Sequence, residues 1–228
     1  MTGRLVAGVD GCREGWVAVV LSEGRFHEAI VARTLPGFLH EYRNVRAVGV
    51  DMPIGLPLST PGRRADGEAK TFLGTRAKSV FPIPPREVLE EEDHNRAVKI
   101  AQRLIGHGIS QQTHALRKKI FEIEDFVSGT RLDVREVHPE VSFRGMNEEP
   151  LGFPKRAWDG LLERKRLLAR EGIKLPEPLG GEAGRVQTDD LLDAAAAAWS
   201  ADRIARDTAC SLPSPPEIIA GQKVAIWY

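Results

Sequence analysis

The feature that most constrains this chain is a three-residue sequence, Gly-Val-Asp, that closes two separate apolar runs. It occurs at residues 8–10, in a run that begins at Leu5, and again at residues 49–51, in a run that begins at Val45. Short apolar runs bounded by turn signals are typical of buried strands. The sequence therefore predicts two strands that each end on a carboxylate.

The segment between the two runs predicts how these strands are related. Two tight turns, both containing glycine, separate the first run from strands predicted at residues 16–21 and 26–32. Short turns join antiparallel neighbours, so the first three strands form an antiparallel meander. A helix predicted at residues 35–42 then returns the chain by a right-handed crossover, which places the strand at 45–50 parallel to the first.

Matching ends of neighbouring parallel strands bring the two acids together. Such strands lie about 4.8 Å apart, so Asp10 and Asp51 are predicted to be side by side. Like charges this close repel one another unless a cation lies between them. Carboxylate oxygens are the ligands that Mg²⁺ and Mn²⁺ prefer. The repeated sequence therefore predicts a site for one of these two ions.

Beyond the second acid the chain is rich in proline and then helical. The other predicted elements are a short helix near residues 65–73, helices at 94–106, 110–127, 154–170 and 189–207, and strands at 132–137 and 224–227. We interpret residues 1–228 as a single α/β domain with a loop-rich and helical insertion at about 53–130. Its mixed sheet has antiparallel strands one to three, then parallel strands four and five, flanked by helices.

Three further acids are candidates for the same site. Glu140 follows the fifth predicted strand, and Asp190 and Asp193 project from one face of the last helix because they are three residues apart. Several carboxylates around two divalent ions can support hydrolysis of a phosphodiester. Each acid also has a structural alternative: a turn residue at a strand end, a partner of the helix dipole, or, for Glu140, an ion pair with arginine.

Five blocks of sequence carry a resemblance to a known family. They are residues 8–12 with 15–16, 49–57, 76–82, 136–143 and 189–194. On these blocks the chain resembles the predicted ribonuclease-H-like nuclease family, one of the families of unknown function. The resemblance implies a ribonuclease H-like fold and a nuclease activity. It matches Asp10 and Asp51 to the first-strand and fourth-strand acids of that superfamily. Asp190 and Asp193 look like the acid pair of its Holliday-junction resolvases.

Basic residues are candidates for substrate binding, because nucleic acids are held mainly through their phosphates. Arg76 and Lys78 follow the loop that leaves the fourth strand, and Lys119 belongs to a short basic cluster. His138, at the end of the fifth strand, is a candidate general base or a structural hydrogen-bonding residue. The basic residues between 154 and 170 form either a second patch or the solvated face of a helix.

The composition restricts which partners the protein can bind and in which cellular compartment we expect it. The 32 Lys and Arg residues balance 32 Asp and Glu residues, so nucleic acid would have to bind a local patch. Cys12 and Cys210 are far apart in the sequence, which argues against a disulfide scaffold or a thiolate zinc site. With no signal sequence and no long apolar window, we expect a cytoplasmic protein without membrane contact. The oligomeric state stays open.

The leading hypothesis is a metal-dependent nuclease that hydrolyses phosphodiester bonds of DNA or RNA with Mg²⁺ or Mn²⁺. One alternative is a non-catalytic nucleic-acid-binding or scaffold protein that retains the fold. Another is a kinase-like or nucleotide-hydrolysing protein, since the actin and hexokinase superfamily shares this fold. The chain of 228 residues is short for the two lobes that such a protein needs, and it shows no second Asp-containing glycine turn.

Overall fold

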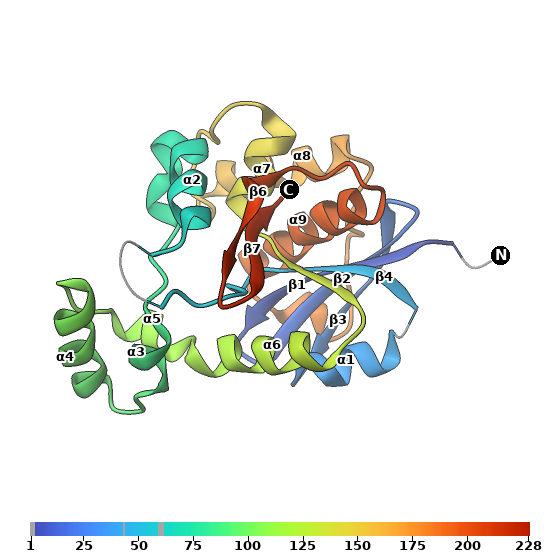
Figure 1. Cartoon of the computed structure of the whole chain (residues 1–228). Coiled ribbons are helices and arrows are strands. Elements are labelled where there is room, and N and C mark those ends of the chain that lie inside the picture. The colour runs from blue at the N-terminus through green and yellow to red at the C-terminus, as the bar shows by residue number, and fades with distance from the viewer. Residues whose placement is uncertain (1–2, 43, 59–61) are drawn as a thin grey trace.

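The computed structural model describes residues 3–42, 44–58 and 62–228 (Figure 1), so Pro61 of the predicted loop-rich stretch lies outside the described residues. Its centre is a five-stranded sheet in the order β3-β2-β1-β4-β5. The strands are β1 (Leu5–Cys12), β2 (Gly15–Ser22), β3 (Arg25–Ala32), β4 (Val45–Val50) and β5 (Asp133–Glu136). The first three are antiparallel, β4 is parallel to β1, and β5 is parallel to β4. This order and polarity match a ribonuclease H-like arrangement and confirm the predicted fold class.

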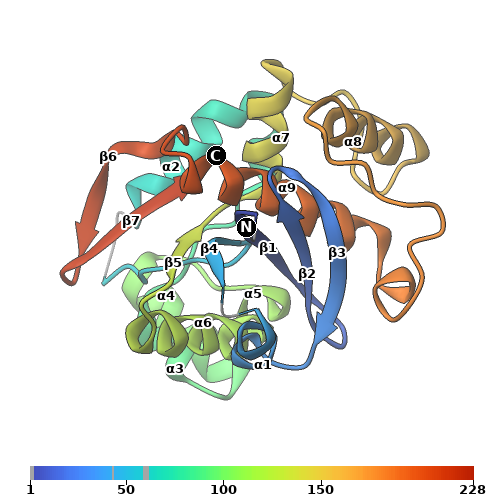
Figure 2. The same cartoon turned by 90° about the vertical axis from the view of Figure 1, so that its right-hand side faces the viewer.

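Helices cover both faces of the sheet. One face packs against α9 (Thr188–Ala205), and the other packs against α1 (Leu35–Glu41) and α6 (Arg117–Gly129). Figure 2 shows α9 on one side of the strands and α1 and α6 on the other. The alanines at residues 194–198 are fully buried. Their small side chains let α9 lie close to the sheet.

The glycines of the two Gly-Val-Asp sequences lie where α9 crosses the sheet. A Cβ atom on Gly8 would lie 1.9 Å from the backbone nitrogen of Ala198, and one on Gly49 would lie 2.6 Å from the carbonyl oxygen of Ala197. Any larger residue would therefore push the helix away. The valine after each glycine belongs to the core on the opposite face. Each Gly-Val-Asp sequence thus makes room for α9, contributes to a core and then supplies an acid.

A helical insertion connects β4 to β5. It contains α2 (Arg64–Leu73), η1 (Gly74–Ser79), α3 (Arg86–Glu90), α4 (His94–Ile105), α5 (Gln111–Ala115) and α6. The helices predicted at 65–73 and 94–106 are confirmed. The single helix predicted at 110–127 is two helices, α5 and α6. Leu116 keeps helical backbone angles at their junction, so the apolar spacing continues across it and does not reveal the break.

The remaining elements are α7 (Pro139–Asn147), α8 (Trp158–Arg170), η2 (Ala183–Arg185), β6 (Ser211–Ile219) and β7 (Gln222–Trp227). Helix α7 was not predicted from the sequence. Pro139 stops the strand but also begins a helix, because the first helical position needs no backbone N–H. The helix predicted from residue 154 begins at Trp158. The strand predicted at 224–227 is confirmed as part of β7.

The prolines at 213, 215 and 216 lie within β6, a strand that was not predicted from the sequence. Proline is tolerated there because β6 pairs with β7 alone, and its register with β7 shifts between Leu212 and Glu217. Trp227 of β7 packs under Arg135 of β5, with 4.2 Å between the guanidinium carbon and the ring centroid. This contact holds the hairpin against the sheet. Within the described residues, no helix combines the length and apolarity needed to cross a membrane.

Candidate metal centre

Three carboxylates converge where β1, β4 and α9 meet. Asp10 lies in β1, Asp51 directly follows β4, and Asp193 lies in the second turn of α9. Each offers one oxygen, and the three oxygens lie within 4.8 Å of one another. Asp10 and Asp193 are buried and Asp51 is half-buried. We call these three residues the acid triad.

The parallel pairing of β1 and β4 sets the position of two triad members. Gly8 pairs with Gly49 and Val9 pairs with Val50, so the two aspartates that follow lie at the same level. The backbone N–H of Asp51 donates to the carbonyl of Val9 at 2.9 Å, which extends the pairing to the acid itself. The predicted juxtaposition of the two strand-end acids is therefore present in the fold.

Burial and mutual repulsion weaken the acidity of the triad. Burial raises the pKa of Asp10 well above its usual value, and the charges of Asp51 and Asp193 raise it further. Burial also raises the pKa of Asp51 and of Asp193 to about 7, even though the charge of nearby Lys155 lowers both. Three ionised carboxylates this close at neutral pH therefore need positive charge between them.

Lys155 supplies part of that positive charge. It comes from the loop between α7 and α8, and its Nζ donates to Oδ2 of Asp193 at 2.6 Å and lies 3.7 Å from Oδ2 of Asp189. Burial lowers the pKa of Lys155, but the attraction of Asp193 and the other acids outweighs burial and raises it overall. Sequence analysis placed Lys155 only within a general basic cluster, because nothing in the local pattern indicates that it reaches α9.

The triad nevertheless keeps an unused acceptor. Oδ1 of Asp193 is buried and has no hydrogen-bond partner within the described part of the chain. Oδ1 of Asp10 accepts the backbone N–H of Gly11 at 2.6 Å. A buried oxygen without a partner is costly, and it is usually explained by a missing water or ion. This oxygen is therefore available to a water molecule or a cation at the triad.

Asp189 and Asp190 have different roles at the start of α9. Asp189 accepts from Nε of Arg156 at 3.0 Å. Burial favours a higher pKa for Asp189, but this hydrogen bond and the charges of Lys155 and Arg156 lower it overall. Asp190 is half-buried and lies outside the triad, close enough for its charge to raise the pKa of Asp10. Its predicted role as a metal ligand stays a prediction.

Glu140 and His138 lie near the triad, Glu140 in the first turn of α7 and His138 at the N-cap position directly before it. Glu140 pairs with buried Arg164, and its second oxygen, Oε2, has no partner among the described residues. The structural alternative for Glu140, an ion pair with arginine, is thus present, while its charge also raises the pKa of Asp51 and Asp193. Burial lowers the pKa of His138, which favours the neutral ring.

His138 is oriented by the η1 segment. Its Nε2 lies 3.3 Å from the carbonyl oxygen of Ser79, so Nε2 carries the proton in the neutral ring. Nδ1 is then the acceptor nitrogen, and it is buried without a partner in the described structure. The candidate base therefore keeps an accepting nitrogen, although that atom faces the interior and not solvent.

The three basic candidates lie on two elements, η1 and α6. Arg76 donates from Nε to the carbonyl of Leu151 at 3.0 Å, and Lys78 is exposed on the same η1 segment. Lys119 of α6 donates to the carbonyl of Gly15 and lies 4.3 Å above the ring of Trp16. Arg76 and Lys119 therefore have structural contacts. Their predicted contacts with substrate stay predictions.

Sequence analysis missed a buried network that fixes the loop after Asp51. Nη2 of Arg63 donates to Oε1 of Glu136 at 2.6 Å and Nη1 donates to Oε2 at 2.8 Å. Oε2 of Glu136 also accepts the backbone N–H of Ile54 at 2.7 Å. Two hydrogen bonds between one guanidinium and one carboxylate fix the orientation of both side chains. The signal in the sequence is limited to an acid, Glu136, near the end of the predicted strand at 132–137.

The family comparison covers the whole site. A model of the family described as "Protein of unknown function (DUF429)" matches residues 8–218. The chain belongs to this family. The DUF429 match includes both Gly-Val-Asp sequences, the loop that carries Lys155 and all of α9. Comparison with curated proteins and with solved structures found no match. The expected membership of a family of unknown function is thereby confirmed.

Proposed function

We propose that the protein is a metal-dependent nuclease of the ribonuclease H-like superfamily and that Asp10, Asp51 and Asp193 hold Mg²⁺ or Mn²⁺. The observation that carries this proposal is the convergence of three carboxylate oxygens within 4.8 Å of one another. Carboxylates without histidine or thiolate ligands suit hard divalent cations. The strand order and the positions of the first two acids support the superfamily assignment.

The residues present fit a divalent cation. Asp193 keeps one buried oxygen without a partner among the described residues, and burial raises the pKa of Asp51 and of Asp193 to about 7. A divalent ion between these carboxylates would favour their ionised forms. A divalent ion bound here would supply Lewis-acid stabilisation of phosphoryl oxygens and lower the pKa of a water molecule. The triad would hold that ion, and Lys155 would remain beside it to offset charge on the phosphate.

One observation favours the non-catalytic alternative. The ammonium group of Lys155 already neutralises part of the triad, as its 2.6 Å hydrogen bond to Asp193 shows. A protein that used these acids only to anchor the loop between α7 and α8 would need no metal. The two functions therefore differ in whether a divalent ion binds at all.

Calorimetric titration with Mg²⁺ and Mn²⁺ separates the two functions. We expect the wild type to bind, and Asp10→Asn, Asp51→Asn and Asp193→Asn each to lose at least roughly tenfold in affinity. The control is Asp202→Asn, since Asp202 is also buried on α9 but pairs with Arg4 and Arg206. Absence of metal binding by the wild type, with and without nucleic acid, would leave the non-catalytic scaffold as the better proposal.

A further inference from the structure

Two aromatic side chains are exposed on the segment that carries Lys155. Phe153 is 47% exposed and Trp158 is 71% exposed, whereas Trp16 and Trp199 are buried. Tryptophan is rarely left this open, because its burial contributes strongly to folding. Exposed aromatic groups that lie near one another mark binding surfaces. We call residues 153–158 the aromatic segment.

The aromatic segment is held in place by contacts on several sides. The backbone N–H groups of Gly152 and Phe153 donate to the carboxylate of Glu163 at 3.0 and 3.3 Å. The carbonyl of Phe153 accepts from Arg164 at 3.3 Å, and that of Leu151 accepts from Arg76 at 3.0 Å. The side chains are therefore presented by an ordered backbone, which reduces the entropy lost when a ligand binds.

The same segment reaches the acid triad. Lys155 contacts Asp193 at 2.6 Å, and Arg156 contacts Asp189 at 3.0 Å. Trp158 is three residues from Lys155, so their Cα atoms lie within about 11 Å, and Phe153 is two residues away, within about 7 Å. Both rings therefore belong to the short segment whose Lys155 contacts the acid triad.

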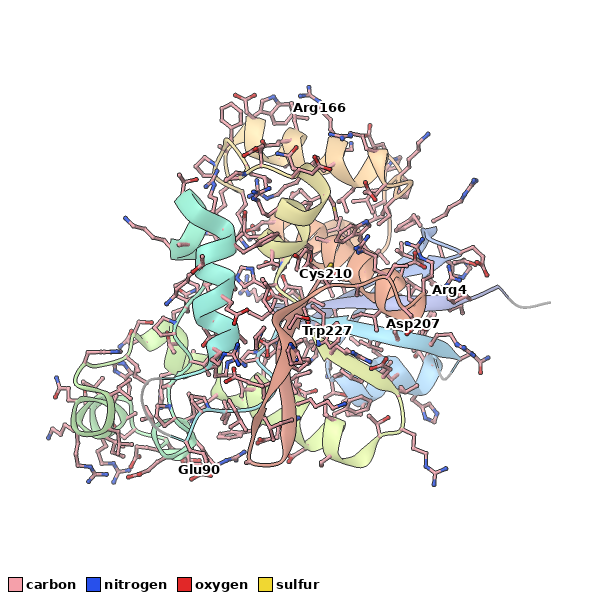
Figure 3. All side chains as sticks on the ribbon, turned by 45° about the horizontal axis from the view of Figure 1, so that its top comes forward. Arg4, Glu90, Arg166, Asp207, Cys210 and Trp227 are labelled. Carbon is pink, nitrogen blue, oxygen red and sulfur yellow. The ribbon has the colours of Figure 1, made fainter. Side chains whose placement is uncertain are left out.

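Positive charge accompanies the aromatic groups. The side chain of Arg156 is 83% exposed despite its contact with Asp189. Arg166 and Arg170 are exposed on α8, and Figure 3 shows Arg166 pointing outward at the edge of the molecule. Exposed aromatic rings combined with arginine are the features that bind single-stranded nucleic acids, through stacking on bases and attraction to phosphates.

We propose that the aromatic segment is a stacking surface for unpaired bases, so that the ligand of this site is single-stranded DNA or RNA. This inference rests on the proposed function for its choice of ligand class. Trp158 supplies the main stacking surface and Phe153 a second one. Bases inside a duplex are stacked on each other, so their faces are not available to these rings. Because every base has such a face, the surface selects for single strands without selecting a sequence.

Fluorescence anisotropy with labelled oligonucleotides tests the inference. The probes are a 12-nucleotide single strand and the duplex of the same sequence, each titrated with the full chain in a chelating buffer that prevents metal-dependent cleavage. Removing one stacking ring costs roughly 1–3 kcal/mol, so we expect Trp158→Ala to weaken single-strand binding roughly 5- to 140-fold. Trp158→Phe should recover most of the affinity, because it restores an aromatic face.

The matched control is Ile218→Ala, which removes another large exposed side chain, 62% exposed on β6, and should leave binding unchanged. The inference is overturned if Trp158→Ala binds the single strand as tightly as the wild type, if duplex binding falls equally, or if the wild type binds no single strand.

Metal calorimetry on Trp158→Ala distinguishes the two proposals. Normal metal binding and cleavage with no effect of Trp158 would overturn the stacking surface alone. Trp158-dependent binding without metal binding would overturn the nuclease alone.

Discussion

At the scale of single residues, the site combines the negative charges of three acids with the positive charge of one lysine. Lys155 offsets the charge of the acid triad in the metal-free protein, and its hydrogen bond to Asp193 is short at 2.6 Å. Taking one partner away from a buried ion pair leaves the other charge uncompensated. The lysine and a divalent cation thus perform the same electrostatic task, and each should reduce the need for the other.

Replacing that lysine tests the balance. Lys155→Met keeps an unbranched side chain one atom shorter and removes its charge. At pH 8 we expect a loss of unfolding free energy of about 1–3 kcal/mol in chelator, and a smaller loss in Mg²⁺. Chemical denaturation in the two buffers measures the difference. Lys165→Met is the control, since Lys165 pairs with exposed Glu177 away from the triad. Equal losses in chelator and Mg²⁺ would contradict the account.

The pH dependence of stability follows from the same residues. Asp51 and Asp193 have pKa values of about 7 in the folded chain, well above the value of 3.8 that applies when they are exposed. Between pH 4 and 7 the folded state therefore binds more protons than the unfolded state. In chelator, the unfolding free energy should fall as pH rises through this range, by up to about 1.4 kcal/mol per pH unit for each proton.

Denaturation of the metal-free protein at pH 5.5 and 7.5 measures this slope. Asp193→Asn should reduce it, because it removes one titrating acid and the repulsion that this acid exerts on Asp51. Metal affinity should change in the opposite direction and increase as pH rises through 7, since the ion competes with protons. A stability that rises with pH in chelator, equally in both proteins, would be inconsistent with these raised pKa values.

At the scale of elements, the site depends on how closely α9 approaches β1 and β4. The Gly-Val-Asp sequences put small residues at the two crossing points, and the buried alanines of residues 194–198 do the same on the helix. The triad oxygen of Asp193 reaches the two strand-end acids only because these backbones are nearly in contact. Helix position and metal affinity should therefore change together.

Gly8→Ala tests that dependence. Its Cβ would lie 1.9 Å from the backbone nitrogen of Ala198, so α9 must move. We expect a loss of about 1–3 kcal/mol in unfolding free energy and a weaker Mg²⁺ affinity. Gly67→Ala is the matched control: Gly67 lies in α2, and its added Cβ would meet nothing within 4 Å. That change should stabilise the helix by about 0.5–1 kcal/mol without altering metal binding. Unchanged metal affinity in Gly8→Ala would show that metal binding does not depend on how closely α9 approaches β1.

The features that could be predicted from the sequence are those set by local patterns. Strands that end on acids can be predicted from short apolar runs, and sheet polarity from short connections. Asp10, Asp51 and the order of the first five strands could therefore be predicted. The β6 strand was not, because proline is tolerated only through its position at an edge. Nor was the ion pair between Arg63 and Glu136, since those residues are far apart along the chain and meet only in the fold.

At the scale of the whole molecule, the equal numbers of acidic and basic residues hide a local arrangement. Acids gather where β1, β4 and α9 meet, and the aromatic segment brings Lys155 and Arg156 into contact with acids of α9. A globally neutral protein would attract nucleic acid only weakly at a distance, so binding would depend on local surfaces. We expect binding to the proposed substrate to depend on this one surface.

The most direct test of the central claim is a cleavage assay on single-stranded DNA and RNA, with Mg²⁺ or Mn²⁺ and in chelator. The account predicts cleavage by the wild type and by Asp202→Asn that stops in chelator. It predicts a rate lower by at least about 100-fold in Asp51→Asn, whose oxygen belongs to the triad. Cleavage that persists in chelator or in Asp51→Asn, or no cleavage of either substrate by the wild type, would contradict the account.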